Sequence, residues 1–235
     1  MWFLFSIFLI TIIVLSLLKS PIVKGMVGEY RVKKILKKAG LSFGGCDLND
    51  IMLEDNRSSS QIDHILLTQK ALYVIETKNY HGHIYGNESS QKWTMTVKHV
   101  NKQRSKKGKL YRKTHISKHQ FYNPIKQNQT HIRKIVNLTN FDQDLPIVNI
   151  VVFGNKAVLK DVTHSKQNYV INEIELLKTI NTIERSILKE IDIVKQIDII
   201  DKLVFLNITL KRERRQHIKR IKTKYQIDFD ISDKI

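Results

Sequence analysis

Apolar residues along the chain recur first at helical and then at strand spacing. In "VKGMVGEYRVKKILKKAG", residues 23–40, they return about every third or fourth position, and the closing Gly40 suits a helix C-cap. Three β-type runs follow over approximately 42–53, 61–67 and 71–78, separated by turn residues. This first part of the chain is therefore predicted to form one helix and three strands.

The middle and the end of the chain continue the alternation of element types. Two shorter strands are predicted near 83–85 and 93–97, and a basic, aperiodic stretch over 98–119 is interpreted as a mobile loop. A second helix opens at Pro124, and "LPIVNIVVFG" is typical of a strand buried on both faces. From about Asn172 the pattern is helical, so the fold class is α/β, a mixed sheet carrying helices.

The first segment of the chain, Trp2–Leu18, contains no charged residue and no Gly or Pro. As a helix it would extend for roughly 25 Å, close to the hydrocarbon thickness of a bilayer. A cleaved signal peptide is the alternative, but a basic leading region and a small-residue cleavage motif are both missing. Basic residues follow the segment, so residues 1–20 are predicted to be a transmembrane anchor that leaves the rest in the cytoplasm.

Charge composition indicates polyanionic partners. The chain has 40 Lys and Arg against 22 Asp and Glu, a formal net charge of +18, which favours nucleic acid or an anionic membrane surface. A merely soluble, lysine-rich surface is the alternative. The single cysteine, Cys46, excludes an intramolecular disulfide and suits a reducing compartment.

Three charged residues interrupt two of the predicted strands, in "QIDHILL" and "YVIETKNY". If these strands pair as a hairpin through Gln69 and Lys70, then Asp63 and Glu76 lie nearly opposite each other. Two neighbouring carboxylates repel, and a divalent cation between them reverses the sign of that interaction. Lys78, on the same face as Glu76, could orient or deprotonate a water or offset charge on a transferring phosphate. The alternative is a solvated strand face.

These residues lie in blocks that resemble a known family. The strings "KGMVGEYRVKKIL", "SSSQIDHILLTQKALYVIETKNYHGHIYGNESSQKW", "FYNPIKQNQTHI" and "IVNIVVF" are similar to the nuclease-related domain, NERD, over about residues 24–154. The resemblance implies membership of the PD-(D/E)xK nuclease superfamily and its restriction-endonuclease-like core of helix, three strands, helix and strand. In this chain Ile62 stands where the superfamily has proline, a residue without chemistry.

The resemblance also implies roles for particular residues. Asp63 and Glu76 would hold Mg²⁺ or Mn²⁺, Lys78 would be the catalytic lysine, and Glu29 and Gln127 would complete the site. Two structural alternatives stay open: Glu29 as a first-turn acid on the helix dipole, and Gln127 as a buried amide that caps a loop. The histidines of "DHI" and "HGH" are left out of the site, because the first points away from Asp63 and the others suit a turn.

The basic stretch over 98–119 is the predicted contact with nucleic acid. Its candidate phosphate-binding residues are Lys102, Arg104, Lys106, Lys107, Lys109, Arg112 and Lys113. Tyr111, Phe121 and Tyr122 are candidates for stacking on splayed bases. A disordered lysine tract against anionic lipid is an equal alternative. No helix-turn-helix or zinc-finger spacing indicates base-specific recognition.

Together these patterns predict a cell-membrane protein with three parts. They are an anchor over 1–20, a nuclease-related domain over 24–171 with a basic insertion over 98–119, and a helical basic tail over 172–235. The leading hypothesis is a single-pass, cytoplasm-facing, Mg²⁺-dependent nuclease that hydrolyses phosphodiester bonds, with DNA the expected substrate. The alternative is a non-catalytic nucleic-acid-binding or scaffold module held at the membrane.

Overall fold

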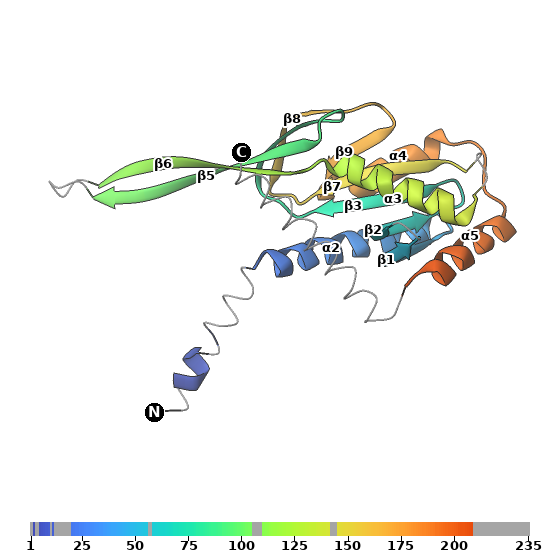
Figure 1. Ribbon diagram of the computed structural model, residues 1–235, viewed down its shortest axis with the longest axis horizontal. Coiled ribbons are helices and arrows are strands. Elements are labelled where there is room, and N and C mark those ends of the chain that lie inside the picture. The colour runs from blue at the N-terminus through green and yellow to red at the C-terminus, as the bar shows by residue number, and fades with distance from the viewer. Residues whose placement is uncertain are drawn as a thin grey trace.

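The chain forms a mixed α/β structure with two mixed β-sheets (Figure 1). The computed structural model describes residues 20–55, 58–104, 110–141 and 145–208, together with residues 2, 5–9 and 11. The predicted helix over 23–40 is α2, Pro21–Ser42. It begins after Ser20, whose side chain accepts a hydrogen bond from the backbone N–H of Val23.

The larger sheet carries the three predicted strands at one side. Its order is β1 (Cys46–Glu54), β2 (Ser59–Leu67), β3 (Leu72–Lys78), β7 (Ile147–Phe153) and β9 (Asn168–Asn172). The first three strands are antiparallel, whereas β7 lies parallel to both β3 and β9. The strand predicted from "LPIVNIVVFG" is confirmed as β7, which is buried because it lies inside the sheet and is covered on both faces.

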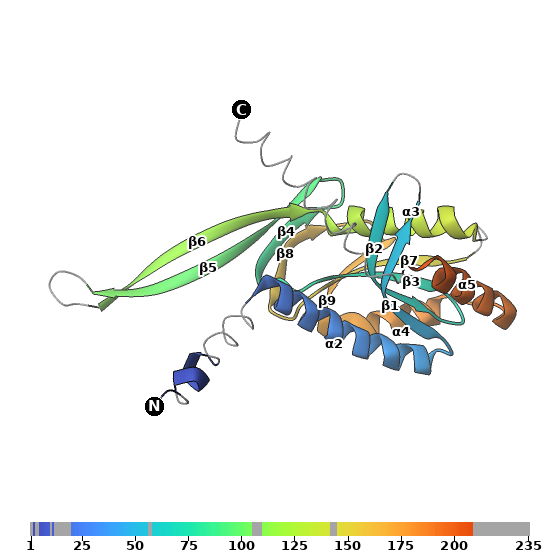
Figure 2. The same ribbon diagram turned by 60° about the horizontal axis from the view of Figure 1, so that its bottom comes forward.

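Helices cover both faces of this sheet (Figures 1 and 2). On one face, Val32 and Leu36 of α2 share a core cluster with Ile180 of α4 (Leu176–Ser186), which follows the short 3₁₀ turn Glu173–Glu175. On the other face, Ile135 of α3 (Pro124–Thr139) shares a cluster with Leu203 of α5 (Ile193–Leu206). The apolar stripes of the helices therefore decide which face each helix buries.

The smaller sheet stands beside the first in the order β6 (Leu110–Tyr122), β5 (Lys92–Arg104), β4 (Gly82–Asn87) and β8 (Ala157–Thr163). Trp93 of β5 stacks on Phe153 of β7, with ring centroids 6.3 Å apart and 6° between the planes. Gly86 lies directly against the Trp93 ring, where a Cβ atom would come 2.1 Å from a ring carbon. This aromatic contact joins the two sheets into one body.

The interpretation of residues 98–119 as a loop is wrong where the structure describes them. Residues 98–104 and 110–119 belong to β5 and β6, which pair in register along thirteen residues each. Nearly all of these residues are exposed on both faces of the strands, so neither face has to be apolar. The sequence therefore lacks the alternation of apolar and polar residues that identifies a half-buried strand. Strands β8 and β9 were likewise not predicted, and they place the start of the helical part at Glu173.

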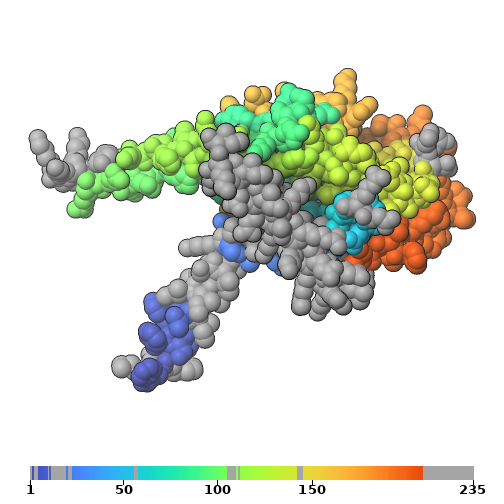
Figure 3. All heavy atoms as spheres, in the orientation of Figure 1, coloured from blue at the N-terminus to red at the C-terminus, as the bar shows by residue number. Residues whose placement is uncertain are grey.

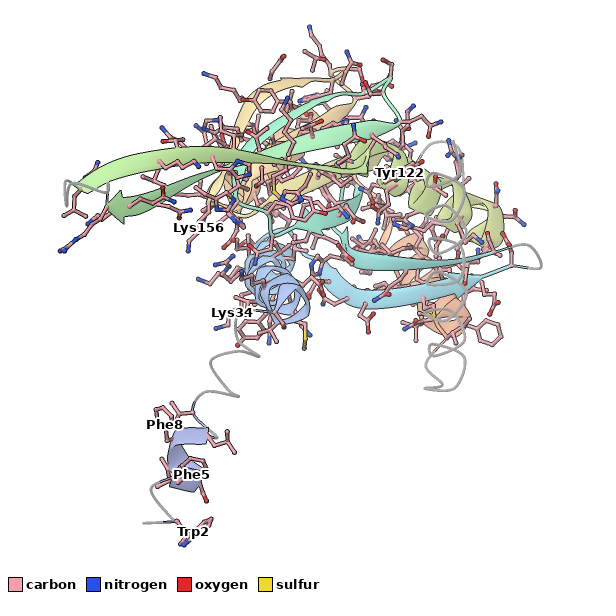
Figure 4. All side chains as sticks on the ribbon, turned by 60° about the vertical axis from the view of Figure 1, so that its left-hand side comes forward. Trp2, Phe5, Phe8, Lys34, Tyr122 and Lys156 are labelled. Atoms are coloured by element: carbon pink, nitrogen blue, oxygen red, sulfur yellow. The ribbon has the colours of Figure 1, made fainter. Side chains whose placement is uncertain are left out.

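Much of the predicted anchor and of the basic tail falls outside the described residues. Trp2, Phe5 and Phe8 are described and exposed (Figure 4), whereas residues 12–19 and 209–235 are not described. Among the residues that are described, no helix is both long and apolar enough to cross a membrane. The anchor over 1–20 and the boundaries of the three parts stay predictions.

Candidate active site

Strands β2 and β3 bring Asp63 and Glu76 together at the carboxyl end of β3. The hairpin pairs Leu67 with Leu72 and His64 with Ile75, so the next step in the same register faces Asp63 toward Glu76. The ladder ends there, and Asp63 Oδ2 accepts a hydrogen bond from the backbone N–H of Thr77 at 2.8 Å. The hairpin predicted from the sequence is confirmed, and with it the proximity of the two acidic residues.

Lys78 and Gln127 complete a hydrogen-bonded group around Glu76. The Lys78 Nζ donates to Glu76 Oε1 at 2.6 Å and to Gln127 Oε1 at 3.1 Å. Gln127 lies in the second turn of α3, which begins after Asn123, whose side chain accepts from the N–H of Ile125. Gln127 therefore contacts the lysine directly, which decides against the loop-capping alternative.

His131 is a member of this group that the sequence interpretation missed. Its Nε2 lies 3.6 Å from Glu76 Oε2, and the side chain is 8% exposed. It follows Gln127 by four positions in "QNQTH", so both project from one side of α3. The four-residue spacing from Gln127 was the feature of the sequence that could have identified His131 as a site residue. By contrast, His64 Nδ1 lies 2.7 Å from Asn49 Oδ1, and His83 belongs to strand β4 rather than to the expected turn.

Glu29 reaches the same place from α2. It lies eight positions after Pro21, and the first turn of α2 contains no acidic residue, so the helix-dipole alternative is wrong. Burial raises the pKa of Glu29, and the negative charges of Asp50 and Glu76 raise it further. Asp50, at the positive-φ position of β1, is thus a further acidic neighbour that the sequence interpretation did not include.

A close helix–strand contact holds α2 at this end of the sheet. Gly28 has no side chain, and a Cβ atom there would come 2.6 Å from the Cβ of Asn79. Asn79 Nδ2 donates to the carbonyl oxygen of Lys24, and its Oδ1 accepts from the Arg31 guanidinium at 3.2 Å. Since Asn79 directly follows Lys78, these contacts fix the position of Glu29 relative to the lysine.

Burial and mutual charge interactions shift the pKa values of Asp63, Glu76 and Lys78. Burial raises the pKa of Asp63 well above its ordinary value, and the Glu76 charge raises it further. Burial also opposes ionisation of Glu76, but the Lys78 ammonium and His131 outweigh it, so the pKa of Glu76 lies below its ordinary value. Burial opposes the charge of Lys78 as well, yet the Glu76 carboxylate raises its pKa above the usual range. With Glu76 only 2% exposed, the solvated-face alternative is wrong.

The donor set fits a hard divalent cation. Carboxylate oxygens are the ligands that Mg²⁺ and Mn²⁺ prefer, and Glu76 Oε2 is buried without a hydrogen-bond donor. Across the described part of the chain, no group of three or more His, Cys, Asp or Glu side chains is arranged to hold a metal. An ion bound by Asp63 and Glu76 would therefore complete its coordination with water and substrate oxygens.

The fold and the site define a two-sheet α/β domain with a carboxylate–lysine cluster at the carboxyl end of a central strand. The nuclease-related domain, NERD, matches residues 24–154, which include this whole cluster. The chain belongs to that family, and the resemblance inferred from the sequence is confirmed.

A relative extends the similarity beyond the domain. An uncharacterized protein of Bacillus anthracis is 34% identical over 160 residues, which cover 68% of this chain and 66% of that protein. The match thus spans slightly less than two thirds of the relative's length. No solved structure matches the chain significantly.

Proposed function

We propose that this protein is a metal-dependent nuclease that hydrolyses phosphodiester bonds of nucleic acid, with DNA as the expected substrate. The observation that carries the proposal is the meeting of Asp63, Glu76 and Lys78 at one strand end, with Glu76 buried and hydrogen bonded to the lysine. Such an arrangement is costly for folding unless it serves a ligand, because buried like charges repel. Membership of a nuclease-related family supports the same conclusion.

In this proposal Asp63 and Glu76 hold Mg²⁺ or Mn²⁺. When bound, the ion supplies Lewis-acid stabilisation of phosphate oxygens and lowers the pKa of a bound water. Lys78 places a positive charge beside the scissile phosphate, and its contacts with Glu76 and Gln127 hold the Nζ in one position. Glu29 and His131 border the same group and orient it.

The order of elements supports a PD-(D/E)xK core. Helix α2 precedes strands β1, β2 and β3, and helix α3 precedes β7, with β4, β5 and β6 inserted between the two halves. This is the helix, three strands, helix and strand expected for the restriction-endonuclease-like fold. Asp63 and the pair Glu76 and Lys78 fall on the second and third strands of that order.

The proposed location is the cell membrane, with a single span and the domain in the cytoplasm. It rests on the uncharged run Trp2–Leu18 and on the basic residues that follow it. A nuclease held there would meet nucleic acid only near the membrane surface.

Cleavage by the full-length chain in detergent tests the proposal. With Mg²⁺, the native protein should convert plasmid DNA, and Asp63→Asn or Glu76→Gln should lower the rate at least about 100-fold. Asp161→Asn on β8 is the matched control, since Asp161 is exposed and lies in the other sheet. Equal rates in native protein and both site variants would assign the activity to a contaminant.

The basic strands β5 and β6 also favour the second candidate function, a module that binds nucleic acid without cutting it. That module would show salt-dependent binding and no turnover with any divalent cation. The adjacent carboxylates of buried Glu76 and half-buried Asp63 argue against it, because in a module that only binds they would repel the polyanion.

A further inference from the structure

Strands β5 and β6 form a two-stranded ribbon that extends beyond the body of the protein (Figures 1, 2 and 3). Only its base is packed, where Trp93 and Phe121 enter the core cluster with Phe153. Farther out, residues 98–104, 112–116 and 118–120 are all exposed. A two-stranded ribbon without cover is only marginally stable in water, so its outer half is suited to meet a ligand.

One face of the ribbon is strongly cationic. The cross-strand register and the alternation of side chains place five basic residues on one face, namely Lys98, Lys102, Arg104, Arg112 and Lys118. Lys102 and Arg112 are direct cross-strand partners, a like-charge pairing that is unfavourable unless an anion lies beside it. The sequence contains no acidic residue between Ser89 and Phe141 to neutralise them.

The base of the ribbon is joined to both sides of the candidate active site. The ring of Phe121 meets that of Tyr80 edge to face at 4.8 Å, and Tyr80 lies two residues after Lys78. Directly after β6, Asn123 caps α3, the helix that carries Gln127. Phe121 and its cross-strand partner Trp93 lie on the ribbon face opposite the cationic residues, so these contacts fix the base of the ribbon beside the site and leave the cationic face uncovered.

The middle of the ribbon offers more to a phosphate backbone than to the bases of a single strand. Residues 98–104 and 112–120 include no Phe, Tyr or Trp on which unpaired bases could stack. Phe121 is engaged with Tyr80 and Trp93, so it is not available for the stacking role expected from the sequence. Of the other two stacking candidates, Tyr111 is the cross-strand partner of Gln103, and Tyr122, which is 43% exposed, lies at the base of the cationic face. Farther out on that face, the described side chains offer ionic contacts with phosphates and aliphatic contacts from Val100 and Ile116.

We propose that the β5–β6 ribbon binds double-stranded DNA, with its cationic face against the phosphate backbone along the major groove. The major groove of B-DNA, about 12 Å wide, admits a two-stranded ribbon, whereas the groove of A-form RNA is too deep and narrow. From Lys98 to Arg104 the ribbon extends for about 20 Å at roughly 3.4 Å per residue, enough to cross from one backbone to the other. The inference deepens the proposed function, since it names the substrate class of the same site.

Binding in EDTA tests this without requiring catalysis. The full-length chain in detergent is titrated with a 30-base-pair duplex and with a single strand of equal length, at several salt concentrations. The ribbon variant replaces Lys98, Lys102, Arg112 and Lys118 with Gln. The control variant replaces Lys33, Lys34, Lys37 and Lys38 of α2 with Gln, which removes the same charge from exposed helix positions away from the ribbon.

We expect the ribbon variant to bind duplex about 10- to 100-fold more weakly and to flatten the slope of log K against log salt by up to about 3.6, which is about 0.9 for each of the four charges removed. The control variant should change affinity less than about threefold, and a ribbon variant with Lys98→Arg, Lys102→Arg and Lys118→Arg should bind as the native chain does. Native-like duplex binding by the Gln variant would overturn the inference. The inference would also be overturned if the single strand bound as tightly as the duplex and lost affinity equally in the ribbon variant.

A membrane role of the ribbon is the remaining competitor. Vesicles with and without phosphatidylserine are therefore titrated with the same variants. Loss of vesicle binding with native duplex affinity would overturn the inference in favour of lipid. Duplex binding that depends on the ribbon, without cleavage in any metal, would contradict the nuclease proposal and support the proposal for the ribbon. Cleavage at the same rate by the native chain and the ribbon variant would support the nuclease proposal and contradict the proposal for the ribbon.

Discussion

The Lys78 ammonium lies 2.6 Å from Glu76 Oε1, two residues away on the same strand. Residues at this spacing share one face of a strand, so the contact follows from local geometry and needs no loop to form it. Glu76 is 2% exposed and Lys78 is 17% exposed, so the pair spans the boundary between the core and the surface. The Lys78 ammonium thus stabilises the ionised form of Glu76, and a substitution of either residue changes the electrostatic energy of the other.

Replacing Lys78 with Met should lower both activity and stability. The variant leaves the Glu76 carboxylate buried without its cation, and breaking such a pair costs about 3 kcal/mol of the free energy of unfolding. Urea unfolding in EDTA measures this loss. The double variant Glu76→Gln with Lys78→Met should recover most of the stability and none of the activity. Equal losses in the single and double variants would show that the pair is not energetically coupled.

A second prediction concerns two glycines of α2. Gly28→Ala would place a Cβ atom 2.6 Å from the Cβ of Asn79, so α2 must move away from the end of β3. We expect a loss of about 1–3 kcal/mol in the free energy of unfolding and a lower cleavage rate, because Glu29 moves with the helix. Gly25→Ala is the matched control: its Cβ would come no closer than 4.0 Å to Glu29 Oε1, so the helix should gain up to about 1 kcal/mol. Thermal unfolding and plasmid cleavage compare the two.

Local pattern was sufficient to predict the hairpin that builds the site. Turn residues at Gln69 and Lys70 and the alternation on either side define the register, and the register alone brings Asp63 to Glu76. His131 was missed because its partner is 55 residues away along the chain, and helical spacing from Gln127 becomes meaningful only once α3 is docked on β3. The ribbon was missed because its stability comes from a cross-strand ladder rather than from an apolar face.

Metal binding should be visible in stability as well as in activity. If Asp63 and Glu76 jointly hold Mg²⁺ or Mn²⁺, the ion relieves their repulsion and binds only the folded state. At 100 times its dissociation constant the ion would add about 2.7 kcal/mol to the free energy of unfolding. The midpoint of thermal unfolding should therefore rise with Mn²⁺ in the native chain and fall back with EDTA. Asp63→Asn should abolish the rise, and an unchanged rise in that variant would place the ion elsewhere.

The last prediction concerns pH and His64, whose ring lies on the face of the sheet away from Asp63. Burial lowers the pKa of His64 from its ordinary value of 6.5 to about 4, so the folded protein disfavours the charged ring. Above pH 6.5 the ring is neutral in both states and has no effect. As the pH falls from 6.5 to 4, the imidazole of His64 is protonated in the unfolded chain but stays largely neutral in the folded chain. The free energy of unfolding therefore declines by about 1.4 kcal/mol per pH unit, or about 3 kcal/mol in all. Urea unfolding in EDTA between pH 7 and pH 4 measures the decline, and His64→Gln should lose this part of it while the contribution of the carboxylates persists. Parallel curves for the native chain and His64→Gln would mean that the ring accepts its proton without unfolding.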